Sequence, residues 1–282
     1  MSALVRAELR KIFTINLWWA LLIPIAVMSF GAGWLGSGFG TISQLEQELG
    51  KPLPLGLLTV SLSTNFSTVF AALFGGLAVS GEHRNKNITT TYLTANPRGS
   101  VLAAKFIAYT GMGLVYGLVN VLFSSVGGLV GAGFDGFGDV GDWFTVGAAG
   151  LLSMVLWTLL GVGFGALVSN SIAVIVSLLV YKFVFEFIVS TFLIGSTAPQ
   201  IGAYLPGSAG NGIVGNLAVP IFISAVAGPS EPETPREIFE ILHFVFGGTY
   251  DHPWWASLLT FAGYTAVFCV GGWYVSSKRD IT

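Results

Sequence analysis

The sequence is organised around one polar segment, SGEHRNKNITTTYLTANPRGS, which occupies positions 80–100. Long apolar runs flank it at 62–79 and at 101–130. No other stretch between apolar runs in the first two thirds of the chain carries as many charged side chains. We expect the flanking runs to be buried and this segment to be exposed, so its position orients the rest of the chain.

Composition places the chain among integral membrane proteins. Hydrophobic residues make up 53% of the sequence and charged residues only 9%, whereas about 25% is charged in an average soluble domain. A soluble chain of 282 residues could not bury so much apolar surface in one core. Cys269 is the only cysteine, which excludes an internal disulfide, and the three histidines show no metal-ligand spacing.

The pattern predicts an all-α integral membrane protein with six transmembrane helices in one domain, residues 1–282. A span needs about 20 apolar residues. The expected spans are 17–35, 62–79, 101–130, 143–168, 172–194 and 254–275. The uncharged stretch at 201–228 is also long enough, but prolines and glycines such as Pro206 and Pro220 interrupt it. We interpret it as a re-entrant extracellular segment between spans five and six.

Two short amphipathic helices are expected outside the spans. In the first, at 2–14, apolar residues recur at helical spacing, whereas Arg6 and Arg10 occupy another face. This pattern favours an interfacial helix lying on the cytoplasmic membrane surface, and a charged extension of the first span is the alternative. The second short helix is expected at 236–246.

Basic residues are segregated by this topology. With six spans, nine of the 12 basic residues fall on one side: Arg6, Arg10, Lys11, Arg84, Lys86, Arg98, Lys105, Lys278 and Arg279. The acidic residues of the loops at 36–59, 131–142 and 229–253 fall on the other side. The excess of basic residues in cytoplasmic loops then predicts a multi-pass plasma membrane protein, of the bacterial inner membrane type, with both termini cytoplasmic.

The sequence shows no sign of catalytic chemistry. It contains no GxxxxGK[ST] phosphate loop and no Ser/His/Asp or Cys/His grouping, so we expect no enzymatic activity from this chain alone. The net charge of −2 does not favour a nucleic-acid partner. Glycines four residues apart, such as Gly161 and Gly165, predict close packing between membrane helices.

The polar segment contains a candidate docking surface. Residues 87–95 are expected to form two turns of helix that end before Pro97. Thr91, Tyr92 and Leu93 would then project from the membrane toward a cytoplasmic partner. The alternative is an ordinary loop whose positive charge only sets topology.

Several short motifs resemble the permease subunits of ABC-2 type transporters. They are RAELRKI at 6–12, Gly81-Glu82 with Thr90 and Leu93, Pro97-Arg98, and Ala103-Ala-Lys105, followed by Leu205-Pro206 before the interrupted stretch. In that family the N-terminal surface helix and the loop between spans two and three press on a separate ATPase subunit. The sequence departs from many relatives at Gly99-Ser100, where those relatives have another basic residue.

The resemblance implies a single ABC-2 type transmembrane domain over 1–282 and a set of docking residues for the ATPase. Those residues are Arg6, Arg10, Glu82, Arg84, Thr91, Tyr92, Leu93, Pro97 and Arg98. It also implies that ATP and magnesium are bound by the partner ATPase rather than by this chain. A second permease chain, identical or different, and membrane lipids are the other implied partners.

A pair of ionisable residues, Lys182 and Glu186, lies near the middle of the fifth expected span. Their spacing of four places them on one helical face. Each costs about 2.5–3.5 kcal/mol at that depth on insertion scales, so such a pair is a candidate functional site. The alternative is a neutralised pair that fixes span five to a neighbouring helix.

The sequence therefore predicts the membrane subunit of an ATP-driven exporter for a hydrophobic or amphipathic substrate such as a drug, lipid or antibiotic. One alternative is an ion- or proton-coupled secondary transporter that uses Lys182 and Glu186. Another is a membrane anchor subunit that transports nothing.

Overall fold

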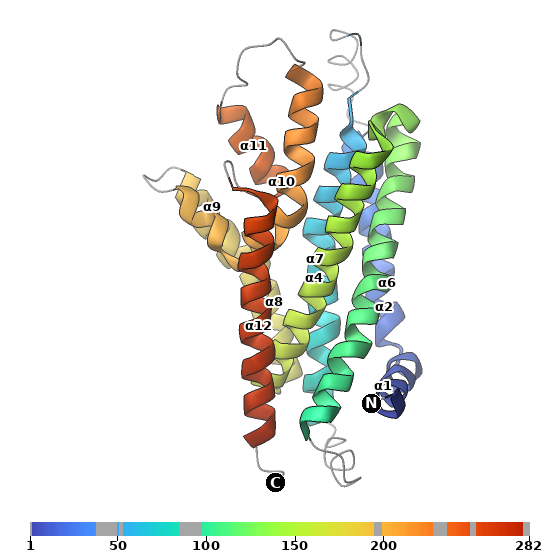
Figure 1. The fold of residues 1–282 in the computed structure, drawn as a ribbon, viewed down its shortest axis with the longest axis vertical. Coiled ribbons are helices and arrows are strands. Elements are labelled where there is room, and N and C mark those ends of the chain that lie inside the picture. Colours follow the sequence, from blue (N-terminus) through green and yellow to red (C-terminus); the bar gives the residue numbers. More distant parts are fainter. Residues whose placement is uncertain are drawn as a thin grey trace.

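The computed structural model describes residues 2–37, 50, 53–84, 98–194, 199–227, 236–248 and 252–278. Every regular element within these ranges is a helix (Figure 1), so the predicted all-α class is confirmed there. Seven helices among the described residues are long and apolar enough to cross a membrane. These helices identify the chain as a multi-pass membrane protein.

The long helices follow one another along the chain with short connections. They are α2 (Leu17–Ser37), α4 (Leu55–Arg84), α6 (Arg98–Ala132), α7 (Val140–Val168), α10 (Pro206–Ala227) and α12 (Trp254–Lys278). A further span is assembled from α8 (Ser171–Val180), the π-helical turn η2 (Tyr181–Phe185) and α9 (Glu186–Ile194). The short elements are α1 (Ser2–Thr14), α11 (Arg236–Phe246) and the 3-10 turns η1 (Phe134–Phe137) and η3 (Pro199–Tyr204).

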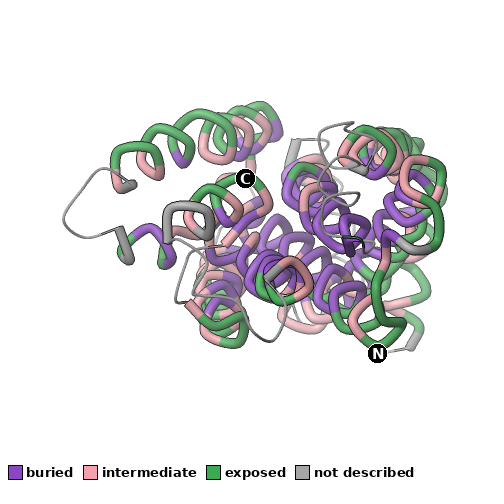
Figure 2. Tube along the Cα trace, turned by 90° about the horizontal axis from the view of Figure 1, so that it is seen from above, coloured by how far each residue is buried: buried purple, intermediate pink, exposed green. Residues whose placement is uncertain are grey.

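Helix α4 forms the centre of the bundle. Its most apolar stretch is 83% buried, whereas the corresponding stretches of α2, α12 and the α8–α9 span are only 17% buried. Viewed along the bundle, the buried residues gather in the middle and the exposed ones at the rim (Figure 2). Helix α4 packs most extensively against α7.

Glycines make the contact between α4 and α7 close. A Cβ atom at Gly161 would overlap the Ala72 carbonyl, and one at Gly165 would overlap the Gly76 carbonyl. The packing role predicted for Gly161 and Gly165 is therefore confirmed, since only the absence of a side chain lets the two backbones touch.

Polar side chains join α2, α4 and α6 inside the bundle. Asn120 Nδ2 donates to Ser29 Oγ at 2.8 Å, and Thr64 Oγ1 donates to Asn120 Oδ1 at 2.9 Å. All three residues are fully or almost fully buried. Hydrogen bonds between membrane helices supply association energy where lipid removes the hydrophobic driving force.

The second span begins earlier than the sequence predicted. Helix α4 starts at Leu55 rather than near 62, and Leu57, Leu58 and Val60 are buried. The ring of Phe137 from η1 lies against Gly56 and covers this extra turn. The predicted polar loop at 36–59 is therefore wrong at its C-terminal end, where residues 55–59 belong to α4. This apolar stretch is too short to be recognised in the sequence as part of a span, and the structure buries it through a tertiary contact.

The stretch at 201–228 is less broken than the sequence indicated. It forms η3 and then a continuous helix, α10, of 22 residues. Pro206 occupies the first helical position, where its missing N–H costs nothing. Gly215 packs against the carbonyl of Gly247. This glycine therefore lets two backbone segments approach closely and does not interrupt α10.

The bundle has two distinct ends. Helix α1 lies at the end where α4 finishes and α6 begins, and α12 runs toward that same end (Figure 1). Helix α9 leans away from the other long helices near the opposite end (Figure 1). The predicted turn at 169–171 is confirmed, with Ser169 in the left-handed conformation and Asn170 capping α8.

Candidate functional site

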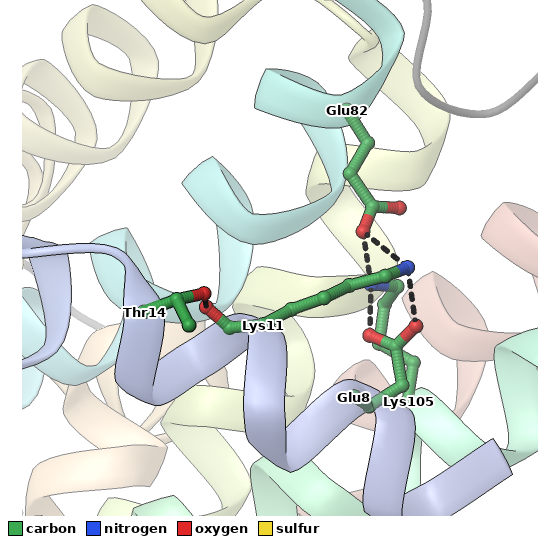
Figure 3. A network of polar contacts seen from close by, with 5 residues as sticks. All are labelled: Glu8, Lys11, Thr14, Glu82 and Lys105. Atoms are coloured by element: carbon green, nitrogen blue, oxygen red, sulfur yellow. Dashed lines mark hydrogen bonds and ion pairs between the residues drawn. The ribbon is translucent and has the colours of Figure 1, made fainter.

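Four charged side chains meet where α1, α4 and α6 come together (Figure 3). Lys105 Nζ lies 2.6 Å from Glu8 Oε2 and 3.1 Å from Glu82 Oε1. Lys11 Nζ lies 2.8 Å from Glu8 Oε1 and 3.2 Å from Glu82 Oε1. Two ammonium groups thus alternate with two carboxylates, and we call Glu8, Lys11, Glu82 and Lys105 the basal ion network.

The interior half of this network is removed from solvent. Glu8 is 4% exposed and Lys105 is 3% exposed, while Lys11 stands on the open side. A buried ion is tolerated only when it is paired and hydrogen-bonded, as both are here. Ile12, four residues after Glu8 on the same face of α1, is buried beside it. Helix α1 is therefore fixed to the bundle by a polar and an apolar contact.

The network keeps Glu8 ionised. Burial acts to raise the pKa of Glu8, but the ammonium groups of Lys105 and Lys11 outweigh that effect and hold the pKa below its ordinary value of 4.5. The carboxylate is consequently charged at neutral pH, and the contact between α1 and α6 is a true ion pair.

The predicted docking residues surround this network where the structure describes them. Glu82 belongs to the network itself, whereas Arg6 and Arg10 are exposed on another face of α1. Arg84 is the last residue of α4 and Arg98 is the first of α6. The predicted docking helix at 87–95, with Thr91, Tyr92 and Leu93, and also Pro97, lies outside the described residues.

Three of the four residues of the network were not predicted as site residues. Glu8, Lys11 and Lys105 were noted only within motifs and charge counts. The signal that could have found them is the position of Lys105 seven residues into an apolar helix, since a cation there requires a carboxylate partner. The sequence could not show that this partner comes from a helix about 100 residues away.

The second predicted site, Lys182 and Glu186, is arranged differently from the expectation of a mutual pair. The two side chains form no direct ion pair with each other, although both are described. Lys182 Nζ donates to Asn211 Oδ1 at 2.7 Å, and it also lies 4.6 Å from the centre of the Trp157 ring. Each charge is instead bound to α10 by neutral groups.

Glu186 caps the N-terminus of α10. Its carboxylate accepts a hydrogen bond from the backbone N–H of Ser208, in the first turn of that helix, and lies against Gly207. The residue at the usual capping position, Leu205, has no side-chain acceptor. A carboxylate at a helix N-terminus is also favoured by the helix dipole. We call Trp157, Lys182, Glu186, Ser208 and Asn211 the mid-span polar site.

The backbone at this site departs from a regular helix. Residues Tyr181–Phe185 form a π-helical turn directly before Glu186. Such turns occur mostly as single bulges and often at functional positions. Here the bulge lies where span five meets α10, and it contains Lys182 itself.

No group of three or more His, Cys, Asp or Glu side chains suited to a metal ion occurs within the described ranges. No protein-family model matches this chain. No curated protein matches its sequence either. Any role for the two polar clusters is therefore argued from their geometry alone.

Proposed function

We propose that this chain is the permease subunit of an ABC-2 type exporter, forming the pathway for a hydrophobic or amphipathic substrate such as a drug, lipid or antibiotic. The observation that supports it is the basal ion network. It ties α1 to both helices that flank residues 85–97, the segment expected to dock on an ATPase. A movement imposed there by a partner would reach α1, α4 and α6 together.

The proposal includes six crossings with α10 re-entrant. In its support, the first turn of α10 lies beside Glu186, near the middle of span five. Asn216, farther along α10, donates to Ser257 Oγ at 3.0 Å in the first turn of α12. Because α12 starts at that level and runs to the end occupied by α1 (Figure 1), α10 need not cross for the chain to return. Both termini and the 82–100 loop would then be cytoplasmic, in a plasma membrane of the bacterial inner membrane type.

The chain would act with partners and perform no catalysis of its own. A separate ATPase subunit would bind ATP and magnesium, and a second permease chain would complete the pathway between membrane lipids. The exposed Arg6 and Arg10, beside the basal ion network, supply positive charge toward the ATPase. No cofactor in this chain and no nucleic acid is part of the proposal.

The test is a purification from native membranes in mild detergent, with the bound proteins identified by mass spectrometry. We expect a phosphate-loop ATPase to remain bound to the unaltered chain and to be lost from the double variant Tyr92→Ala with Leu93→Ala. The matched control is Phe192→Ala, an exposed apolar residue on α9 at the other end of the bundle. Full retention of the ATPase by the double variant would reject the docking role.

A second candidate function, ion- or proton-coupled transport, is favoured by one observation. Lys182 and Glu186 are each bound by neutral groups rather than by each other, which leaves both charges available to respond to an ion. Proteoliposomes distinguish the two functions. Export driven by ATP without an ion gradient supports the exporter, and export driven by a pH gradient without ATP supports the secondary transporter.

A further inference from the structure

Three deeply buried side chains carry a polar atom with no hydrogen-bond partner among the described residues. The atoms are Asn65 Oδ1, Trp157 Nε1 and Glu186 Oε2, and the side chains are 8%, 2% and 6% exposed. An orphaned buried polar atom costs several kcal/mol in a membrane-spanning region. Such atoms in a native fold therefore indicate an additional hydrogen-bonding ligand.

The three atoms lie along one face of α10. Glu186 Oε2 touches Gly207, and Trp157 Nε1 lies 2.6 Å from the position a Cβ atom would take at Gly210. Asn65 and Asn211 both border Gly247. Positions 207, 210 and 211 share a helical face and span only about 6 Å along the axis. Such spacing suits one or a few small bridging molecules.

The same face is not fully enclosed by protein. Lys182, Ser208 and Asn211 are only partly buried. The Lys182 ammonium has three N–H groups, one of which is donated to Asn211. The site thus combines partly exposed side chains with unused donors and unused acceptors.

The charge of the site selects the ligand class. An anion near Trp157 Nε1 would meet the carboxylate of Glu186, and a cation near that carboxylate would meet the ammonium of Lys182. A small neutral molecule that donates and accepts hydrogen bonds satisfies both halves. Buried water typically makes about three hydrogen bonds to groups of this kind.

We propose that α10 carries an internal water site, bounded by Asn65, Trp157, Lys182 and Glu186, at mid-depth in the bundle. Water there solvates both charges of span five while each keeps its hydrogen bond to α10. This site is independent of ATPase docking, and it exists whether the transport is driven by ATP or by an ion gradient.

The test is X-ray radiolytic footprinting of the purified chain in lipid nanodiscs, because hydroxyl radicals form at bound water and modify adjacent aromatic rings. Rates are normalised to the same residue in unfolded protein. The Tyr181 hydroxyl also has no hydrogen-bond partner among the described residues. We expect Trp157 and Tyr181 to be modified several-fold faster than Tyr116, which is fully buried and whose hydroxyl donates to the Trp18 carbonyl. Equal, slow rates for Trp157 and Tyr116 would overturn the proposal.

A variant distinguishes a specific site from general opening of the helices. Glu186→Leu removes an acceptor from the site, and it should slow the modification of Trp157 and Tyr181 several-fold. Ser224→Leu, an exposed change on the same helix, should leave both rates unaltered. If Glu186→Leu does not fold, Asn65→Leu takes its place. Rates that stay fast in the folded site variant would also overturn the proposal.

Discussion

The basal ion network and the mid-span polar site contain the same kinds of charged group in opposite arrangements. In the basal network, Lys105 contacts two carboxylates directly and Glu8 contacts two ammonium groups. In the mid-span site, Lys182 and Glu186 each contact a different residue of α10, and one carboxylate oxygen has no partner among the described residues. The first arrangement is complete within the chain, whereas the second is not.

The difference indicates that the two buried clusters of charged groups have different roles. A closed network of opposite charges holds its helices in one geometry, because any separation strands a charge in a medium of low dielectric constant. An open site keeps its charges at the cost of unsatisfied atoms, and water or a ligand can exchange there. We therefore expect substitutions in the basal network to cost the most stability. We expect the mid-span site to be the one that exchanges water or a ligand.

The largest effect is expected from Lys105→Met. It leaves the buried carboxylate of Glu8 without its closest partner, and breaking a buried pair in this way typically costs about 3–5 kcal/mol. Thermal unfolding in detergent should show the loss, and limited proteolysis should release α1. The matched control is Lys278→Met, an exposed lysine at the end of α12, for which we expect no measurable change. A similar loss in both variants would contradict the role of the network.

A smaller effect is expected from Glu186→Gln. The amide keeps one acceptor for the N–H group of Ser208 but removes the charge, and a weakened hydrogen bond of this kind costs about 1–3 kcal/mol. A double-mutant cycle with Lys182→Met should show weaker coupling than a cycle between Glu8→Gln and Lys105→Met, since only the second pair is in contact. Equal coupling in the two cycles would mean that Lys182 and Glu186 act as a direct pair after all.

Much of the fold follows from the sequence, because each apolar run of sufficient length must become a helix in a membrane. The runs around 17–35, 101–130 and 254–275 are helices in the structure, and the short helices at 2–14 and 236–246 are confirmed. The contacts of the sites do not follow in the same way. The spacing of Lys182 and Glu186 places them on one face, but it cannot show that Asn211 and Ser208 bind them.

The next smaller effect is expected from acid, which should weaken the basal ion network. The pKa of Glu8 is held below its ordinary value of 4.5 by Lys105 and Lys11, so its contribution to stability is fully present above pH 4.5. That contribution is lost as the pH falls through the lower pKa of the folded protein. Proteolysis of α1 with an acid-active protease should accelerate over that range. Glu8→Gln should remove this acid dependence, and an unchanged dependence would assign it to another group.

The smallest effect is expected from Lys11→Met. The Lys11 side chain is 39% exposed, and solvent-screened ion pairs contribute only about 0–1 kcal/mol. Thermal unfolding should therefore detect little change, while Lys105→Met in the same assay shows the full loss. A large effect of Lys11→Met would show that solvent screens the ion pairs of Lys11 less than the exposure of its side chain indicates.

The π-helical turn at Tyr181–Phe185 bears on how the length of this chain can vary. A π turn accommodates one more residue than an α turn, so the extra residue is absorbed without rotating the helices on either side. Removing one residue, for example Phe183, would restore an α-helical turn and leave Glu186 facing α10. A single deletion elsewhere in this span would turn all that follows by about 100°. Span five can therefore lose a residue at this turn with its capping carboxylate still in register.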